Sequence, residues 1–156
     1  MRKYHIDESL DDPYDPSYTI KMFERLEFYD QLSVRLYIWD LPGKPDYDHV
    51  TNQYLTNADA AIIMYDTTNP KAYSDTERIL NKIMRLKSKD DFCCILFGNK
   101  NDLQHKRSVG IGKMMKLAQK YDIELQEGSI KEDFNIDKMF YSLTAQCIDE
   151  LYEIEE

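Results

Sequence analysis

Two short apolar runs constrain the fold more than any other feature of this 156-residue sequence: AAIIMY at residues 60–65 and FCCILF at residues 92–97. Continuous runs of this length are typical of strands that are buried on both faces. Between them, Ser74 and Glu77 match a capping box at the start of a helix, and apolar side chains follow at helical spacing. The sequence therefore predicts an α/β fold, a mostly parallel sheet with helices on both faces.

The rest of the chain extends this pattern. Apolar and polar residues alternate over 18–39, and Asp30-Gln31 divides the segment into the two strands of a hairpin. Helices are expected over 112–121 and along an apolar stripe from Ile136 to Leu151, with a short strand near 123–125. No repeat or linker interrupts the 156 residues, which predict a single domain.

Composition narrows the classes of partner. The chain has 20 basic and 29 acidic residues, and its formal charge of −9 opposes binding to nucleic acid or to an anionic membrane. The adjacent Cys93 and Cys94 lie in an apolar run and are read as packing residues. No run reaches the length of about 20 apolar residues of a membrane span, and neither a signal peptide nor a prenylation cysteine is expected. These features predict a soluble, cytoplasmic protein without a membrane anchor.

Three motifs each follow a predicted strand: DLPG at residues 40–43, NKND at 99–102 and EGSIK at 127–131. Ligands of open α/β sheets bind at the carboxyl ends of the strands, so these motifs mark a ligand site. Each motif alone is a weak signal. Their order along the chain makes the combination specific.

Further runs accompany the motifs above: IWD at 38–40, IMYDTTN at 63–69, GNKNDL at 98–103 and KRSV at 106–109. On these runs and motifs, residues 9–152 resemble the Ras-like small GTPases, and among them the Rab branch. The resemblance implies a P-loop NTPase-like, three-layer fold with five helices and six strands, the first of them central between the third and fourth. It also implies GTP or GDP and Mg²⁺ as ligands.

For guanine, the resemblance implies that Asp102 accepts hydrogen bonds from two N–H groups of the base and that Ser129 orients this carboxylate. A carboxylate suits the task because it is an acceptor-only group. Adenine would leave its charge unpaired, which is costly in a dry pocket.

The remaining guanine-side residues are Asn99, Lys100, Ile130 and Lys131. The two lysines would cover the faces of the base, Asn99 would tie neighbouring loops together, and the Ile130 N–H would meet the guanine carbonyl. An alternative stays open, in which Asn99 and Asp102 only cap a turn.

On the phosphate side, the resemblance implies weak Mg²⁺ ligation by Ser17, where the family usually has threonine, and by Asp40 through a bound water. The N–H of Gly43 would meet the γ-phosphate. Lys44 stands where most of the family has the glutamine that orients the attacking water, a role for which Ras is a standard example. A protonated lysine cannot accept a hydrogen bond from water, so no catalytic residue is assigned and hydrolysis is expected to be slow.

The phosphate loop, Gly-x-x-x-x-Gly-Lys-Ser/Thr, has no match. The nearest run, GIGK at 110–113, has Arg107 at the position of the first glycine and Met114 at that of the hydroxyl, and it is read as a helix start. Aligned with the family, Met1 falls just after the phosphate loop. The chain is therefore expected to be truncated at its N-terminus relative to the family, without the first strand, and impaired in nucleotide binding.

Two functions follow from these expectations. The first is a guanine-nucleotide switch in vesicle traffic or signalling, peripheral to endomembranes through partner proteins. The alternative is a catalytically inactive pseudoGTPase that acts as a protein-interaction module. In both, effector or regulatory proteins would bind the switch and hairpin face. The aromatic residues expected there are Phe23, Trp39, Tyr47 and Tyr54. Core packing would explain some of these residues equally well.

Overall fold

The computed structural model describes residues 20–41, 48–88 and 92–154. The chain divides into two compact units, Met1–Ala58 and Asp59–Glu156. Each is described separately below, and the single domain expected from the sequence stays a prediction.

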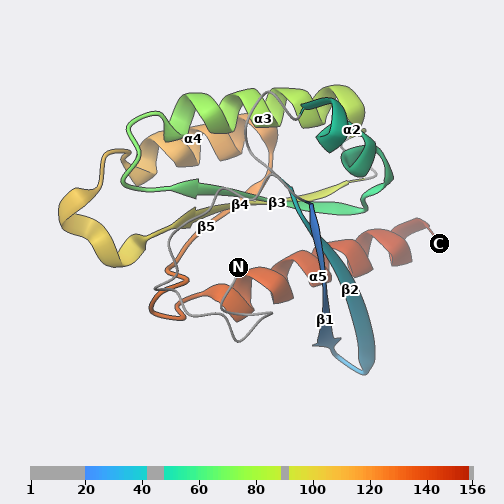
Figure 1. Ribbon diagram of the computed structural model, residues 1–156. Helices are drawn as coiled ribbons and strands as arrows, with labels where there is room; N and C mark the ends of the chain where they lie inside the picture. The colour runs from blue at the N-terminus through green and yellow to red at the C-terminus, as the bar shows by residue number, and fades with distance from the viewer. Residues whose placement is uncertain (1–19, 42–47, 89–91, 155–156) are drawn as a thin grey trace. The chain divides into compact units, whose positions relative to one another are not determined.

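The first unit contains the hairpin that the alternating pattern predicts (Figure 1). Strand β1 (Lys21–Tyr29) pairs antiparallel with β2 (Leu32–Asp40), and the Tyr29–Leu32 pair closes a two-residue turn. Asp30 in this turn has a φ of 52°, a left-handed conformation that aspartate tolerates because its short side chain can bond locally. Helix α2 (Asp48–Asn57) follows and buries Leu55.

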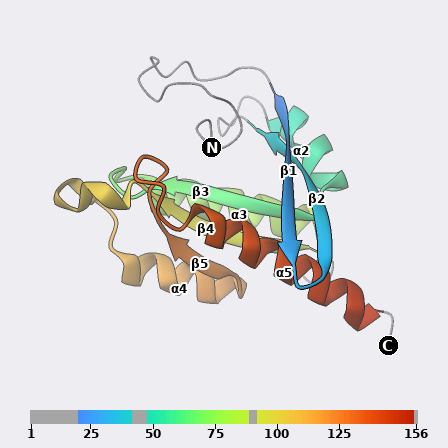
Figure 2. The same cartoon turned by 90° about the horizontal axis from the view of Figure 1, so that it is seen from below.

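The second unit contains a parallel sheet of β3 (Ala60–Asp66), β4 (Cys93–Asn99) and β5 (Glu124–Glu127), in that order. Figures 1 and 2 show helices on both of its faces. Helices α3 (Ala72–Leu86) and α4 (Ile111–Tyr121) lie on one face, and α5 (Ile136–Ile154) lies on the other. A 3₁₀ segment, η3 (Asn101–Lys106), follows β4. The predicted α/β class, with a parallel sheet between helical layers, is confirmed.

The core lies around β4. Ile95, Leu96 and Phe97 have no exposed surface, and Cys93 and Cys94 are buried as expected. Strand β3 differs from its prediction, because only Ile63 and Tyr65 of its side chains are buried. The reason is its position: among the described strands, β3 pairs with β4 alone and lies at the edge of its sheet.

The family resemblance implies a sheet of six strands, of which this chain is expected to lack the first, and the described residues form five strands. Their strands make two separate sheets, one of two strands and one of three. Within the described residues, β2 pairs with β1 and β3 pairs with β4.

The capping box predicted for α3 is wrong. The helix begins at Ala72, and the hydroxyl of Ser74, inside its first turn, donates to the Lys71 carbonyl oxygen at 2.9 Å. The helix begins earlier in the chain than predicted because of a turn at Asn69. Its side-chain oxygen accepts from the Lys71 N–H at 3.0 Å, and its backbone carbonyl accepts from the Ala72 N–H at 3.0 Å. A local side-chain bond of this kind competes with the predicted cap.

The other two predicted helices form with small differences. Gly110 precedes α4 as its N-cap, which confirms the interpretation of residues 110–113 as a helix start. The apolar stripe of α5 is buried from Ile136 to Leu143, but Leu151 at its end is 60% exposed.

We expect Leu96→Ala to lower the free energy of unfolding by about 2–5 kcal/mol, because it opens a cavity in a strand packed on both faces. Leu151→Ala, the matched control at an exposed position of the same unit, should change it by less than about 0.5 kcal/mol. Urea unfolding followed by circular dichroism measures both. Equal losses for the two variants would contradict the assignment of β4 as the centre of the core.

Candidate functional site

Two loops at the carboxyl ends of neighbouring strands bring the predicted site residues together. We call residues 99–102 after β4 and 128–131 after β5 the strand-end loops. The strands are parallel and adjacent, so the loops leave the same edge of the sheet. Backbone hydrogen bonds join the loop region: the Asn101 N–H donates to the Gly128 carbonyl at 2.9 Å, and the Gly128 N–H donates to the Gly98 carbonyl at 2.8 Å.

Side chains also connect the two loops. The Ser129 hydroxyl donates to Asp102 Oδ1 at 2.6 Å, and the same hydroxyl accepts from the Glu132 N–H at 3.1 Å. Asn99 Oδ1 accepts from the Ile130 N–H at 3.0 Å. Asn99 thus ties neighbouring loops, and it does so through the N–H that the resemblance assigns to a guanine carbonyl. Ser129 is 2% exposed, so its geometry is fixed by packing.

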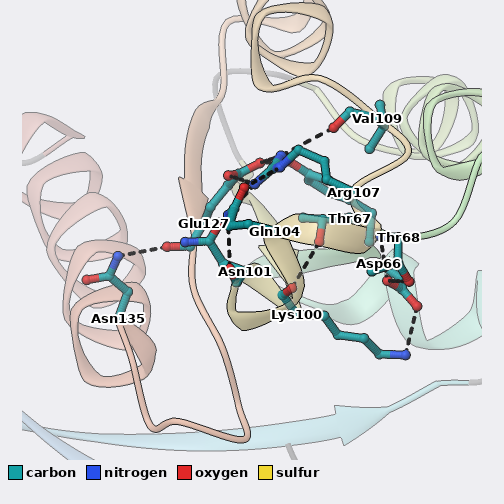
Figure 3. Close-up of polar contacts among 11 residues, drawn as sticks. Asp66, Thr67, Thr68, Lys100, Asn101, Gln104, Arg107, Val109, Glu127 and Asn135 are labelled. Carbon is teal, nitrogen blue, oxygen red and sulfur yellow. Dashed lines mark hydrogen bonds and ion pairs between the residues drawn. The ribbon is translucent and has the colours of Figure 1, made fainter.

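Lys100 lies between the buried end of β4 and solvent, in a left-handed conformation with a φ of 65°. Its Nζ pairs with Asp66 Oδ2 at 2.8 Å, while Thr68 donates to Asp66 Oδ1 from both its N–H and its hydroxyl, at 2.8 and 2.7 Å (Figure 3). The Thr67 hydroxyl donates to the Lys100 carbonyl at 3.2 Å. These contacts hold a backbone conformation that a lysine otherwise disfavours.

The pKa of Asp66 follows from these contacts. Partial burial alone would raise it, but the hydrogen bonds from Lys100 and Thr68 stabilise the carboxylate and lower the pKa below its ordinary value. Sequence reasoning missed Asp66. Its signals were its place directly after the run at 60–65 and its inclusion in IMYDTTN, to which no role was given.

The strand-end loops have the chemistry to hold a flat, hydrogen-bond-donating ring. Asp102 is half-buried and offers acceptors only. Lys100 and Lys131 are exposed, and their aliphatic stems can cover an apolar surface while the ammonium groups stay in water.

Two glycines in this region are required by close packing. A Cβ at Gly98 would lie 2.6 Å from the Tyr65 ring and 2.9 Å from Glu127 Cγ. A Cβ at Gly128 would lie 2.2 Å from the Phe134 carbonyl oxygen, which is backbone and cannot rotate away. A larger residue at Gly128 would therefore have to move backbone, and one at Gly98 would have to displace the side chains of Tyr65 and Glu127.

The residues expected on the phosphate and magnesium side are mostly not described. Ser17, Gly43 and Lys44 lie outside the described residues, and Asp40 ends β2 in the first unit. The described ranges contain no group of three His, Cys, Asp or Glu side chains that could hold a metal ion.

The aromatic set expected at the hairpin is only partly brought together. The Trp39 and Tyr54 rings lie 5.0 Å apart. Phe23 pairs with Ile38 across the hairpin, whereas Trp39 pairs with Met22, so Phe23 and Trp39 lie on opposite faces. Grouping them in one face was wrong, because neighbouring strand residues alternate between faces. Tyr47 lies outside the described residues.

Comparison with known proteins gives one family. The sequence profile described as "Ras family" matches residues 2–149. A curated relative, Ras-like protein 1 of Saccharomyces cerevisiae, is 27% identical over 143 residues, which are 92% of this chain and 44% of the yeast protein. The chain thus spans less than half the length of that relative. Among the described residues, no helix is long and apolar enough to span a membrane.

Gly128→Ala should destabilise the second unit by about 1–3 kcal/mol, because the new methyl group meets backbone. Gly112→Ala is the matched control: its Cβ would meet nothing within 4 Å, and it lies in α4. Alanine is the better helix former, so this control should leave stability unchanged or raise it by up to about 1 kcal/mol. Urea unfolding of both variants tests the close approach at Gly128.

The lowered pKa of Asp66 makes stability depend on pH. Because the folded pKa lies below the unfolded one, the ionised carboxylate stabilises the fold above the unfolded value of about 3.9, and this contribution is lost as pH falls through the folded pKa. The stability gap between the natural chain and Asp66→Asn should therefore shrink as urea titrations move from pH 7 to pH 3. The gap at pH 7 should be smaller in a Lys100→Gln background. A gap independent of pH would contradict the ion pair.

Proposed function

The chain belongs to the Ras family, and we propose that it is a Rab-like guanine-nucleotide switch whose strand-end loops bind the guanine base. The observation that carries this proposal is the linkage of the two loops by Ser129–Asp102 and Asn99–Ile130. The loops that these contacts join also carry Lys100 and Lys131, both of which are exposed. A turn that served only to end β4 would need no side chain from the second loop, which counts against the capping alternative.

In this proposal Asp102 accepts from the two N–H groups on one edge of guanine. Ser129 holds the carboxylate in place before the base binds, so binding loses little side-chain conformational entropy at Asp102. Lys100, tied to Asp66, and Lys131 cover the two faces of the ring. Adenine lacks those donors and would leave the carboxylate unpaired. Binding of a guanine carbonyl by the Ile130 N–H would require that N–H to be shared with Asn99 or released by it.

The phosphate side of the proposal rests on sequence. Asp40 and Ser17 would contribute to a weak Mg²⁺ site and Gly43 would contact the γ-phosphate of GTP. The sequence contains no Gly-x-x-x-x-Gly-Lys-Ser/Thr motif, and in the family that loop makes most contacts to the β-phosphate. We therefore propose that this polypeptide binds GDP weakly, and that Lys44 makes GTP hydrolysis slow.

A second function is favoured by Lys44 and by the exposed hairpin surface around Trp39, which is 47% exposed and contacts Tyr54. In this alternative the chain is a pseudoGTPase that binds effector or regulatory proteins through the hairpin and switch face. Both functions would place it in the cytoplasm, in vesicle traffic or signalling, and at endomembranes through its partners.

Asp102→Asn tests the base assignment. An amide presents one donor and one acceptor, which suits the carbonyl and N–H edge of xanthine better than the two donors of guanine. We expect the natural chain to prefer GDP over xanthosine diphosphate and the variant to reverse that preference, each by roughly tenfold or more. Isothermal titration calorimetry measures both ligands.

Asp133→Asn is the matched control, because Asp133 is exposed and has a φ of 56°, which asparagine also tolerates. It should keep the natural preference. A dissociation constant for GDP below 1 µM, on the order of −8 kcal/mol, would overturn weak binding. No binding of GDP at millimolar concentration would favour the pseudoGTPase.

A further inference from the structure

Arg107, which follows η3, uses every N–H of its guanidinium group. Nε donates to Gln104 Oε1 at 3.0 Å. Nη1 donates to the Val109 carbonyl at 3.2 Å and to Glu127 Oε1 at 2.9 Å. Nη2 donates to Asn101 Oδ1 at 2.8 Å and to Glu127 Oε2 at 2.6 Å (Figure 3). A guanidinium group has five N–H donors, and all five are paired here.

The pair of Arg107 and Glu127 is shielded from water. Their side chains are 18% and 9% exposed, and the two parallel bonds between them make the pair bidentate. The Tyr65 hydroxyl adds a third bond, donating to Glu127 Oε1 at 2.9 Å. Burial, together with this bond, raises the pKa of Tyr65, and the bond to Glu127 raises that of Arg107. Gly98 leaves the space that Tyr65 and Glu127 fill.

This cluster contacts both strand-end loops. On one side Arg107 holds Asn101, the residue before Asp102. On the other side Glu127 is the residue before Gly128, and its carbonyl accepts from Asn135 Nδ2 at 2.7 Å. The ion pair therefore connects the residue before Asp102 to the residue before Gly128.

We propose that Arg107 and Glu127 are positioning residues that hold the two strand-end loops at the spacing needed for guanine selectivity. The part of this inference that concerns nucleotide rests on the proposed function. A lysine at position 107 keeps the charge but cannot replace the planar, five-donor group, since its ammonium is a single point with three donors. The arrangement thus needs arginine rather than any cation.

A role in stability alone does not account for the cluster. Buried ion pairs contribute little net stability because removing two charges from water offsets their attraction. If the pair served only to stabilise the fold, its loss would weaken all ligands and all regions of the second unit alike. Loss of a positioning pair acts on the two loops and on the contact that Asp102 makes.

The first experiment uses the nucleotide-free chain and hydrogen exchange read by NMR. In Arg107→Lys we expect the protection of the Asn101 and Gly128 amides to fall roughly tenfold or more, because these amides open locally once the loops separate. Amides in the middle of β4 should keep their protection. Lys120→Ala, which removes the Lys120–Glu77 ion pair of 2.8 Å between α4 and α3, is the matched control and should leave both loops unchanged.

The second experiment compares GDP with inosine diphosphate, whose base lacks the exocyclic amino group that Asp102 would bind. The natural chain should bind GDP about tenfold more tightly than the inosine compound, and Arg107→Lys should reduce this ratio toward one. Glu127→Gln keeps the size of the side chain and an acceptor for Tyr65, so it serves as a second variant if Arg107→Lys does not fold. Ile83→Val, a core change in α3, should leave the ratio intact.

Unchanged exchange at Asn101 and Gly128 in both Arg107→Lys and Glu127→Gln would overturn the positioning role. An unchanged ratio of the two nucleotide affinities in both variants would overturn the role in selectivity. Failure of the natural chain to bind either nucleotide would overturn the proposed function and the nucleotide part of this inference. The exchange result would then still decide whether the ion pair holds the loops.

Discussion

Burial of β4 on both faces is the constraint on which the second unit depends. Helices cover the two sides of this strand, and its three central side chains have no exposed surface. A strand held in this way has little freedom to shift, so whatever leaves its carboxyl end starts from a fixed point. The Asn99 carbonyl also accepts from the Thr67 N–H at 3.1 Å, which ties the end of β4 to the end of β3. The packing of β4 in the core therefore fixes where the strand-end loops begin.

Much of this architecture could be predicted, because the spacing of apolar residues along a helix or strand is a local property of the sequence. The apolar run at 92–97 predicted a strand buried on both faces. The hairpin over 18–39 was predicted from the alternation of apolar and polar residues and a two-residue turn. Prediction was wrong where a neighbouring side chain made a competing contact, as at Ser74, where the turn at Asn69 begins the helix earlier. It was also wrong for β3, since the burial of a strand depends on how many neighbours it has, and its own residues do not report that number.

For the candidate site, too, some contacts could be predicted from the sequence and others could not. The family resemblance implied that Ser129 orients Asp102 and that Asn99 ties neighbouring loops, and the structure contains the Ser129–Asp102 and Asn99–Ile130 hydrogen bonds. The bond of Asn99 to the Ile130 N–H was not expected, because that N–H was assigned to guanine. Asp66, Arg107 and Glu127 were quoted as parts of motifs without any role. Arg107 and Glu127 are 20 residues apart, and in the sequence each is one charged residue among many. Charged side chains are mostly exposed, so only the fold reveals that these two are shielded and bonded to each other.

The charge of the chain explains why such positioning matters. At −9, the protein repels an anionic nucleotide at long range, so electrostatic attraction to the whole molecule cannot supply affinity. Asp102 would add a further negative charge at the point of contact, and the cationic end of Lys100 is already paired with Asp66. In the proposed function, affinity for guanine would then come from short, directional bonds between groups held in place before the ligand arrives. Directional bonds weaken steeply when donors and acceptors are misaligned. A fully paired arginine between the two loops is one way to maintain that alignment, because its five donors lie in one plane and allow little motion once all of them are occupied.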